Sequence, residues 1–137
     1  MQNDTTAAGI AGLILLAHGS RDALWRQPIE AVLGAVRQTR PHGLAACAYL
    51  EACAPDLPTA ARGLVEAGAM RITVLPLFLG TGKHAREDIP KLVQEIRDTH
   101  PQVAVELEPA VGEHPRVTAL LAELALAAME PPGSSGS

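Results

Sequence analysis

Short apolar runs alternate with longer segments of helical periodicity along most of this 137-residue chain, and this alternation restricts the fold more than any other feature. Apolar runs at 12–17, 44–50, 71–78 and 103–107 are typical of strands buried on both faces. The segments 23–40, 55–68, 87–99 and 115–129 repeat apolar residues at helical spacing. Strands joined by helices form parallel sheets through right-handed crossovers. The chain is therefore predicted to be an α/β protein with the order β-α-β-α-β-α-β-α.

Four strands connected in this way usually adopt the order 2-1-3-4, in a flavodoxin-like sheet that binds ligands at the carboxyl ends of its strands. The length suits one domain, which we expect to cover residues 12–130 after an N-terminal extension of residues 1–11. Residues 131–137 are rich in Pro, Gly and Ser, and we expect them to form a disordered tail.

The composition argues against several classes of partner. A net charge of −4 and only three aromatic residues leave neither a basic surface nor a stacking platform for nucleic acid. No apolar stretch approaches the ~20 residues that span a membrane, and no basic residue precedes the apolar run that begins at Ala7. Cys47 and Cys53 match no zinc or redox spacing, and we expect free thiols in a reducing cytoplasm.

Three side chains with metal-binding chemistry follow the first three predicted strands. His18 comes directly after the first, Glu51 after the second, and His84 in the segment after the third. In the order 2-1-3 these strand ends are neighbours, and adjacent strands lie ~4.8 Å apart. Two imidazoles and one carboxylate, with a position left open, suit a borderline divalent metal that must also be released. The sequence therefore predicts that His18, Glu51 and His84 converge on one ion.

A nucleotide site is not expected from the glycine-rich segment. Gly80 to Lys83 is similar to the end of a phosphate-binding P-loop, but Leu77 stands where the first glycine is needed. His84 replaces the Ser or Thr that binds Mg²⁺, so ATP is not predicted as a cofactor. The other histidines lie beside prolines that mark turns, and we expect them at the surface: His42, His100 and His114.

Three motifs carry a family resemblance that covers about residues 12–124. They are Leu-Leu-Ala-His-Gly-Ser-Arg-Asp at 15–22, Tyr-Leu-Glu at 49–51, and the longer segment from Pro76 to Pro90. His18 and Glu51 are 33 residues apart, and Glu51 and His84 are 33 residues apart, which is also the spacing in the family that these motifs resemble. The chain resembles the class II chelatases, and among them the short sirohydrochlorin cobaltochelatase/ferrochelatase family (CbiX/SirB-like).

The resemblance implies a lyase that inserts Co²⁺ or Fe²⁺ into sirohydrochlorin without ATP, on the route to cobalamin or siroheme. It implies no cofactor beyond the metal that is inserted. His18 and His84 would hold the metal, with Glu51 as a third ligand or a proton acceptor. The chain corresponds to a half-molecule of longer relatives, which implies a homodimer around a shared cleft. A histidine-rich stretch seen in nickel-inserting relatives is missing, which argues against Ni²⁺.

The implied substrate carries eight carboxylates, so its cleft should contain cations. Arg21, Lys83 and Arg86 lie in the same segments as the predicted ligands and are candidates to pair with those carboxylates. Two alternative functions remain open. One is a metal-binding or delivery module without catalysis that uses His18, Glu51 and His84, and the other is a flavodoxin-like domain that binds a phosphorylated molecule through Gly80 to Lys83.

Overall fold

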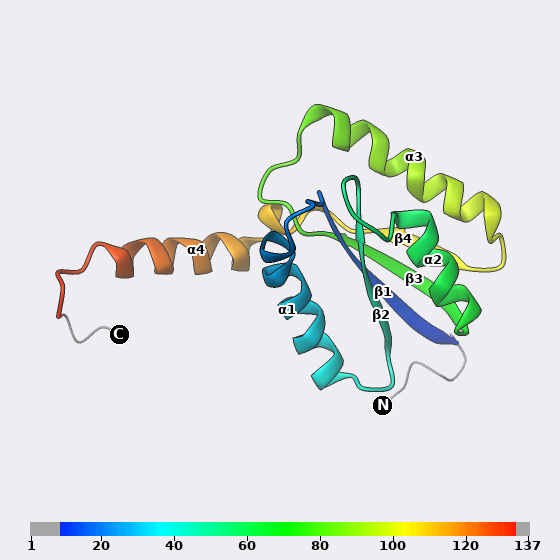
Figure 1. Cartoon of the computed structure of the whole chain (residues 1–137), viewed down its shortest axis with the longest axis horizontal. Coiled ribbons are helices and arrows are strands. Elements are labelled where there is room, and N and C mark those ends of the chain that lie inside the picture. The colour runs from blue at the N-terminus through cyan, green and yellow to red at the C-terminus, as the bar shows by residue number, and fades with distance from the viewer. Residues whose placement is uncertain (1–8, 134–137) are drawn as a thin grey trace.

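The computed structural model describes residues 9–133, and it shows a four-stranded parallel sheet between layers of helices (Figure 1). The order β2-β1-β3-β4 confirms the predicted class and strand order. The central strands pair in register, so that Leu15 of β1 lies opposite Cys47 of β2 and Leu75 of β3. The strands are β1 (Ile10–Ala17), β2 (Leu44–Tyr49), β3 (Ala69–Pro76) and β4 (Ala104–Leu107).

The helices follow the predicted alternation, although several boundaries of helices and strands differ from the predicted ones by one to four residues. They are α1 (Ala23–Thr39), α2 (Leu57–Glu66), α3 (Lys83–Thr99), the short 3₁₀ turn η1 (Val111–Glu113) and α4 (Pro115–Ala128). β1 begins at Ile10, inside the expected N-terminal extension, because Ile10 pairs with Ala69 of β3. α3 begins at Lys83 instead of Glu87, because Gly82 already stands at the N-cap position. Residues 1–8 of the expected extension and residues 134–137 of the expected tail lie outside the described residues.

Side-chain caps set the starts of three helices. Asp22 accepts a hydrogen bond from the Leu24 N–H at the start of α1, and Asp56 accepts one from the Thr59 N–H at the start of α2. At the start of α4, Nδ1 of His114 accepts from the Arg116 N–H at 3.1 Å. Such caps satisfy backbone donors that a helix cannot pair internally, and each contributes about 1 kcal/mol.

The two faces of the sheet are covered differently. On one face, Ile14, Leu16 and Val74 are fully buried beneath α2 and α3. On the other face, Leu15 and its neighbours pack against Ile29 and Leu33 of α1. Because successive residues of a strand point to opposite faces, β1 supplies both clusters and is the most completely buried strand.

The last helix does not take part in either layer. α4 extends away from the body of the domain (Figure 1), packs against η1, and buries none of its residues. Half of the sheet on the α1 side is therefore left without a helix. None of the helices within residues 9–133 is long and apolar enough to cross a membrane.

Candidate functional site

His18 is the first residue after β1, at the carboxyl edge of the sheet. Its imidazole is exposed, and it stacks on Phe78 with ring centroids 4.3 Å apart and an interplanar angle of 29°. Phe78 follows β3 and is itself only 3% exposed. The aromatic ring thus supports one side of the imidazole and leaves its edge open. The sequence analysis did not single out Phe78, although its position in the third motif and its rarity in this chain were available signals.

The segment that carries Glu51 is joined to His18 through the backbone. The Glu51 N–H donates to the His18 carbonyl at 2.9 Å, and the Leu50 N–H donates to the Ala17 carbonyl at 3.0 Å. Gly19 has φ +104°, and a Cβ there would lie 1.9 Å from the Glu51 carbonyl oxygen. Only glycine permits this contact and this backbone conformation. The ends of β1 and β2 are therefore held together at the candidate site.

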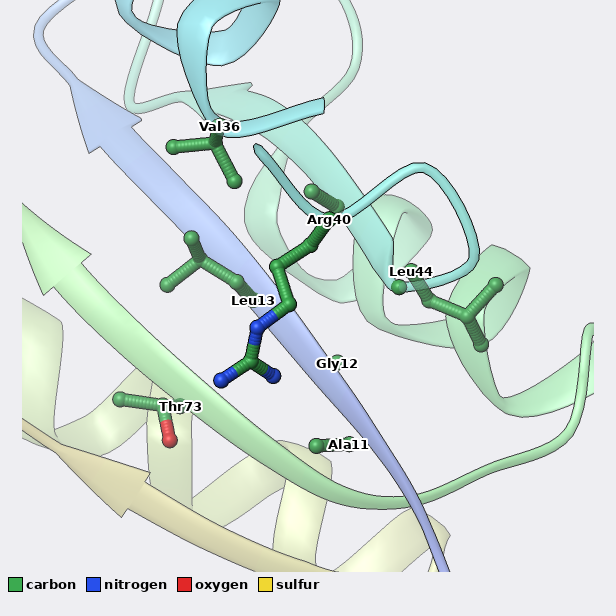
Figure 2. Close-up of a pocket in the computed structure, with 9 residues that line it drawn as sticks. Ala11, Gly12, Leu13, Val36, Arg40, Leu44 and Thr73 are labelled. Atoms are coloured by element: carbon green, nitrogen blue, oxygen red, sulfur yellow. The ribbon is translucent and has the colours of Figure 1, made fainter. Parts of the chain in front are cut away.

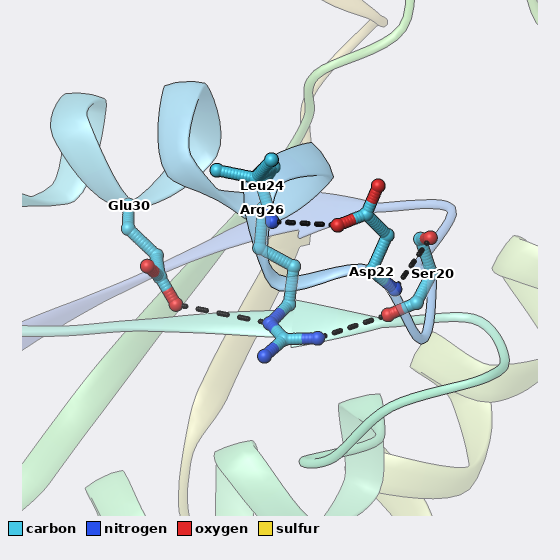
Figure 3. A network of polar contacts seen from close by, with 5 residues as sticks. All are labelled: Ser20, Asp22, Leu24, Arg26 and Glu30. Carbon is cyan, nitrogen blue, oxygen red and sulfur yellow. Dashed lines mark hydrogen bonds and ion pairs between the residues drawn. The ribbon is translucent and has the colours of Figure 1, made fainter.

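A polar network shapes the chain between His18 and α1 (Figure 3). The Asp22 N–H donates to Oγ of Ser20 at 3.0 Å, while the Asp22 carboxylate caps α1 through Leu24. Nη1 of Arg26 donates to the Ser20 carbonyl at 3.0 Å, and its Nε lies 3.9 Å from the Glu30 carboxylate. Ser20 and Asp22 therefore order the segment that follows His18. Arg26 was missed by sequence reasoning, since an Arg and a Glu four residues apart on a helix look like an ordinary surface pair.

The segment after β3 is anchored at two points. The Leu77 N–H donates to the Leu16 carbonyl at 2.8 Å, which extends the pairing with β1. Further along, the Gly112 N–H donates to the Phe78 carbonyl at 2.9 Å. A Cβ on Gly112 would lie 1.8 Å from the Leu79 carbonyl oxygen, so η1 packs directly on this backbone. These contacts fix the position of Phe78 behind His18.

His84 lies in the first turn of α3 and is exposed, as are Lys83 and Arg86 on the same turn and Arg21 on the segment after His18. Nη1 of Arg86 donates to the Thr81 carbonyl at 2.6 Å. Arg86 therefore holds the start of α3. The sequence predicted a contact of Arg86 with the substrate and did not predict this structural contact.

The expected convergence of His18, Glu51 and His84 on one point is not met in this single chain. Across residues 9–133, no three His, Cys, Asp or Glu side chains form a group that could hold a metal ion. His84 lies in the first turn of α3, after residues 77–82, whereas His18 directly follows β1. The structure joins the backbones at His18 and Glu51, and leaves all three side chains exposed.

The two cysteines are free thiols, as predicted, and they lie on the α1 side of the sheet. Burial raises the pKa of the Cys47 thiol. Burial, together with the neighbouring charge and hydrogen bond of Cys47, raises the pKa of Tyr49 to about 12. The Cys53 N–H donates to the Glu51 carbonyl at 2.8 Å across Ala52, which has φ +69°. Cys53 thus follows a tight turn that shapes the Glu51 segment.

Fold and site together define a flavodoxin-like α/β domain with exposed imidazoles at the carboxyl edge of its sheet. The CbiX family profile matches residues 12–128, so the chain belongs to the CbiX family.

Individual relatives agree with this assignment. A Sulfolobus acidocaldarius protein named sirohydrochlorin cobaltochelatase is 30% identical over 125 residues, which cover 90% of this chain and 97% of that protein. A Priestia megaterium protein named sirohydrochlorin ferrochelatase is 28% identical over 111 residues, covering 81% of this chain but 42% of the longer relative. A crystal structure from Marinobacter aquaeolei, described as a putative cobalamin biosynthesis CbiX protein, superposes with a TM-score of 0.76 at 31% identity. It covers 86% of this chain and 96% of that one.

Proposed function

We propose that this protein is a lyase that inserts Co²⁺ or Fe²⁺ into sirohydrochlorin in the cytoplasm, without ATP. The observation that carries the proposal is membership of the CbiX family together with a relative named for this activity that this chain matches over nearly its whole length. The site supports it, because exposed imidazoles and a carboxylate occur at the sheet edge where such folds bind ligands.

In this proposal His18 and His84 present the metal as a pair. A metal–nitrogen bond of about 2.1 Å requires the two imidazole nitrogens to lie within roughly 4 Å of each other. Gly80 and Gly82 have no atoms near the position of a Cβ, so the backbone before His84 has room to adjust. Two protein ligands leave several metal positions free for water and then for the ring nitrogens. The stacking of His18 on Phe78 keeps one imidazole fixed while this exchange takes place.

Glu51 is the proposed proton acceptor. Insertion of a divalent metal releases two pyrrole N–H protons, and a nearby carboxylate lowers the barrier to their removal. The Glu51 backbone is bonded to the His18 carbonyl, which keeps its side chain near the metal without requiring it to be a ligand. A metal-bound imidazole nitrogen has no free lone pair, so His18 and His84 are poorer bases once the metal is bound.

Exposed cations suit an anionic macrocycle. Arg21 and Lys83 flank the two histidines and are proposed to pair with its carboxylates, and Arg86 is proposed to do so while it holds Thr81. The candidate site is an open edge in the single chain, because all three predicted ligands are exposed. We therefore propose a homodimer in which a second copy closes the cleft.

The test is a spectrophotometric insertion assay with sirohydrochlorin and Co²⁺, Fe²⁺ or Ni²⁺. His18→Ala and His84→Ala should each lower the rate ~100-fold or more, since loss of a ligand costs at least as much as loss of its supporting partner. His42→Ala, at an exposed site in the turn before β2, should keep the full rate.

Glu51→Gln should lower the rate more than it weakens metal binding. Wild-type rates in both histidine variants would contradict the site. A protein that binds metal but leaves the absorbance of metal-free sirohydrochlorin unchanged would instead be a delivery module.

A further inference from the structure

The proposed ligands, base and cations leave the faces of the tetrapyrrole ring without a partner. These faces are apolar, and sites for such ligands combine a mostly apolar lining with a few polar groups. The hollow in Figure 2, where Arg40 extends across β1 toward Thr73, lies at the other end of the sheet from His18, beside the beginnings of β1 and β2. Apolar side chains that stand at the carboxyl edge are better placed to contact the ring.

Trp25 is the only tryptophan of the chain, and it lies in the first turn of α1. Its N–H donates to the Asp22 carbonyl at 3.0 Å, which joins this turn to the segment that follows His18. Ile29 and Leu33 pack α1 onto the sheet. Because Trp25 precedes Ile29 by four residues, it lies on the same side of α1, one turn closer to the carboxyl edge. Trp25 is 39% exposed, so its indole offers an aromatic surface to solvent there.

Leu79 supplies apolar surface from the segment after β3. Leu77 packs on the α1 side of the sheet, and Phe78 packs on the opposite side. Backbone hydrogen bonds of Leu77 and Phe78 to the segments on either side keep the chain extended here, so Leu79 follows on the α1 side. Leu79 is 67% exposed, although Gly112 packs directly on its backbone. A fixed backbone thus presents a large apolar side chain to solvent.

The exposed apolar side chains that α4 does not supply are concentrated near the site. Within residues 9–133, five large apolar side chains outside α4 and its C-cap are exposed, and three of them lie in the first turn of α1 or directly after Phe78: Leu24, Trp25 and Leu79. Single exposed apolar residues are ordinary, whereas a group of them marks a contact surface. Leu24 faces another direction. It precedes Leu33 by nine residues, which at about 100° per residue places it on the opposite side of α1, and Figure 3 shows it directed away from Arg26.

We propose that Trp25 and Leu79 form an apolar rim that contacts the face of the tetrapyrrole substrate, with the indole stacked on the ring. This inference rests on the proposed function. Phe78 backs the His18 imidazole from the side of the sheet that α2 and α3 cover, and the apolar rim stands on the α1 side. A flat ring that lies across the carboxyl edge reaches both. Stacking on an aromatic side chain adds to the gain from buried apolar area, so the rim holds the ring over the metal while the cations bind its periphery.

Equilibrium binding of metal-free sirohydrochlorin, followed by its absorbance, tests the apolar rim. Leu79→Asn keeps a side chain of similar shape without its apolar character, and should raise the dissociation constant ~10-fold. Trp25→Gln should raise it by a similar factor, whereas Trp25→Phe keeps an aromatic face and should stay within ~3-fold of the wild type. Leu24→Asn is the matched control, because Leu24 is 69% exposed in the same turn as Trp25 but on the other side of α1. It should change the constant by less than ~2-fold, and equal constants for Leu24→Asn and Leu79→Asn would overturn the inference.

Steady-state kinetics separates contact with the ring from support of the metal site. Leu79→Asn should raise KM for sirohydrochlorin ~10-fold, and should leave kcat and the dissociation constant of Co²⁺ within ~3-fold of the wild type. Circular dichroism checks that the variant keeps the fold. A matching loss of Co²⁺ affinity would show that Leu79 supports the metal ligands instead. A weaker dimer in sedimentation with an unchanged KM would show that Leu79 contacts a second copy, and either result overturns the inference.

The outcomes distinguish this inference from the proposed function. A wild-type protein that inserts metal, with Leu79→Asn and Trp25→Gln at full affinity for sirohydrochlorin, contradicts only the apolar rim. A protein that binds the metal-free ring through Trp25 and Leu79 but inserts no metal contradicts only the proposed chemistry. A wild-type protein that does not bind sirohydrochlorin contradicts both.

Discussion

Gly19→Ala is the substitution that most directly tests how the site is held together. The new Cβ would lie 1.9 Å from the Glu51 carbonyl oxygen, whereas ordinary contacts begin at 3.4 Å. The two segments must therefore move apart by more than 1 Å. That movement stretches the hydrogen bond between the Glu51 N–H and the His18 carbonyl, and the one between the Leu50 N–H and the Ala17 carbonyl.

The magnitude follows from two contributions. Placing alanine at φ +104° costs about 1–3 kcal/mol. Weakening two backbone hydrogen bonds costs about 0.5–1.5 kcal/mol each. The free energy of unfolding should fall by about 2–6 kcal/mol, which lowers the midpoint of thermal unfolding by roughly 8–24 °C. Single domains have about 5–15 kcal/mol of stability, so a chain that starts near the middle of this range remains mostly folded at 25 °C after the substitution.

Urea unfolding followed by circular dichroism measures the stability, and the insertion assay measures the site. We expect both to decline, because the shift separates His18 from Glu51. Gly34→Ala is the control, since Gly34 lies inside α1 with no atom within 4 Å of a Cβ. Gly34→Ala should raise the free energy of unfolding by up to about 1 kcal/mol and keep the full rate of metal insertion. An unchanged urea midpoint for Gly19→Ala would refute the structural reasoning, and a large loss of stability with full activity would refute the functional part.

Three further predictions concern other parts of the fold. Gly112→Ala should lower the free energy of unfolding by about 1–3 kcal/mol in urea titrations and should slow metal insertion. The reason is that a Cβ at this position collides with the backbone that positions Phe78 behind His18. An unaltered rate of metal insertion would show that this backbone contact is not needed for the activity. Burial and the adjacent Cys47 raise the pKa of Tyr49 to about 12, so the unfolded chain loses this proton near pH 10 while the folded chain keeps it. The free energy of unfolding should therefore fall by up to about 2.7 kcal/mol between pH 10 and pH 12, and urea titrations of Tyr49→Phe should lack most of that decline. Hydrogen bonds from Thr59 lower the pKa of Asp56. Asp56→Ala should therefore lower the free energy of unfolding by about 1 kcal/mol at pH 7, and this difference from wild type should shrink below about pH 4. A difference in stability that does not depend on pH would show that the carboxylate charge is not involved.

Local patterns were sufficient for the class and order of the fold. Apolar runs of strand length separated by helical periodicity are typical of a parallel sheet with helices between the strands. The order 2-1-3-4 is the usual one for four such strands, and the structure confirms it. The candidate site was predicted less completely. The backbone junction between His18 and Glu51 agrees with neighbouring strand ends, whereas His84, predicted from the segment after the third strand, lies in the first turn of α3. A helix start set by Gly82 is a weak signal in the sequence, because glycine caps a helix without a side-chain hydrogen bond.

The amino-acid sequence by itself determined the order of elements and the residue types at the carboxyl edge, since periodicity and strand ends are local properties. The tertiary structure alone decided three other features. It showed that Phe78 supports His18 and that Gly19 and Gly112 are needed for backbone contact, because these depend on residues far apart in the chain. It also showed that α4 leaves the sheet half-covered, because the surface a helix covers depends on where its connecting segment directs it.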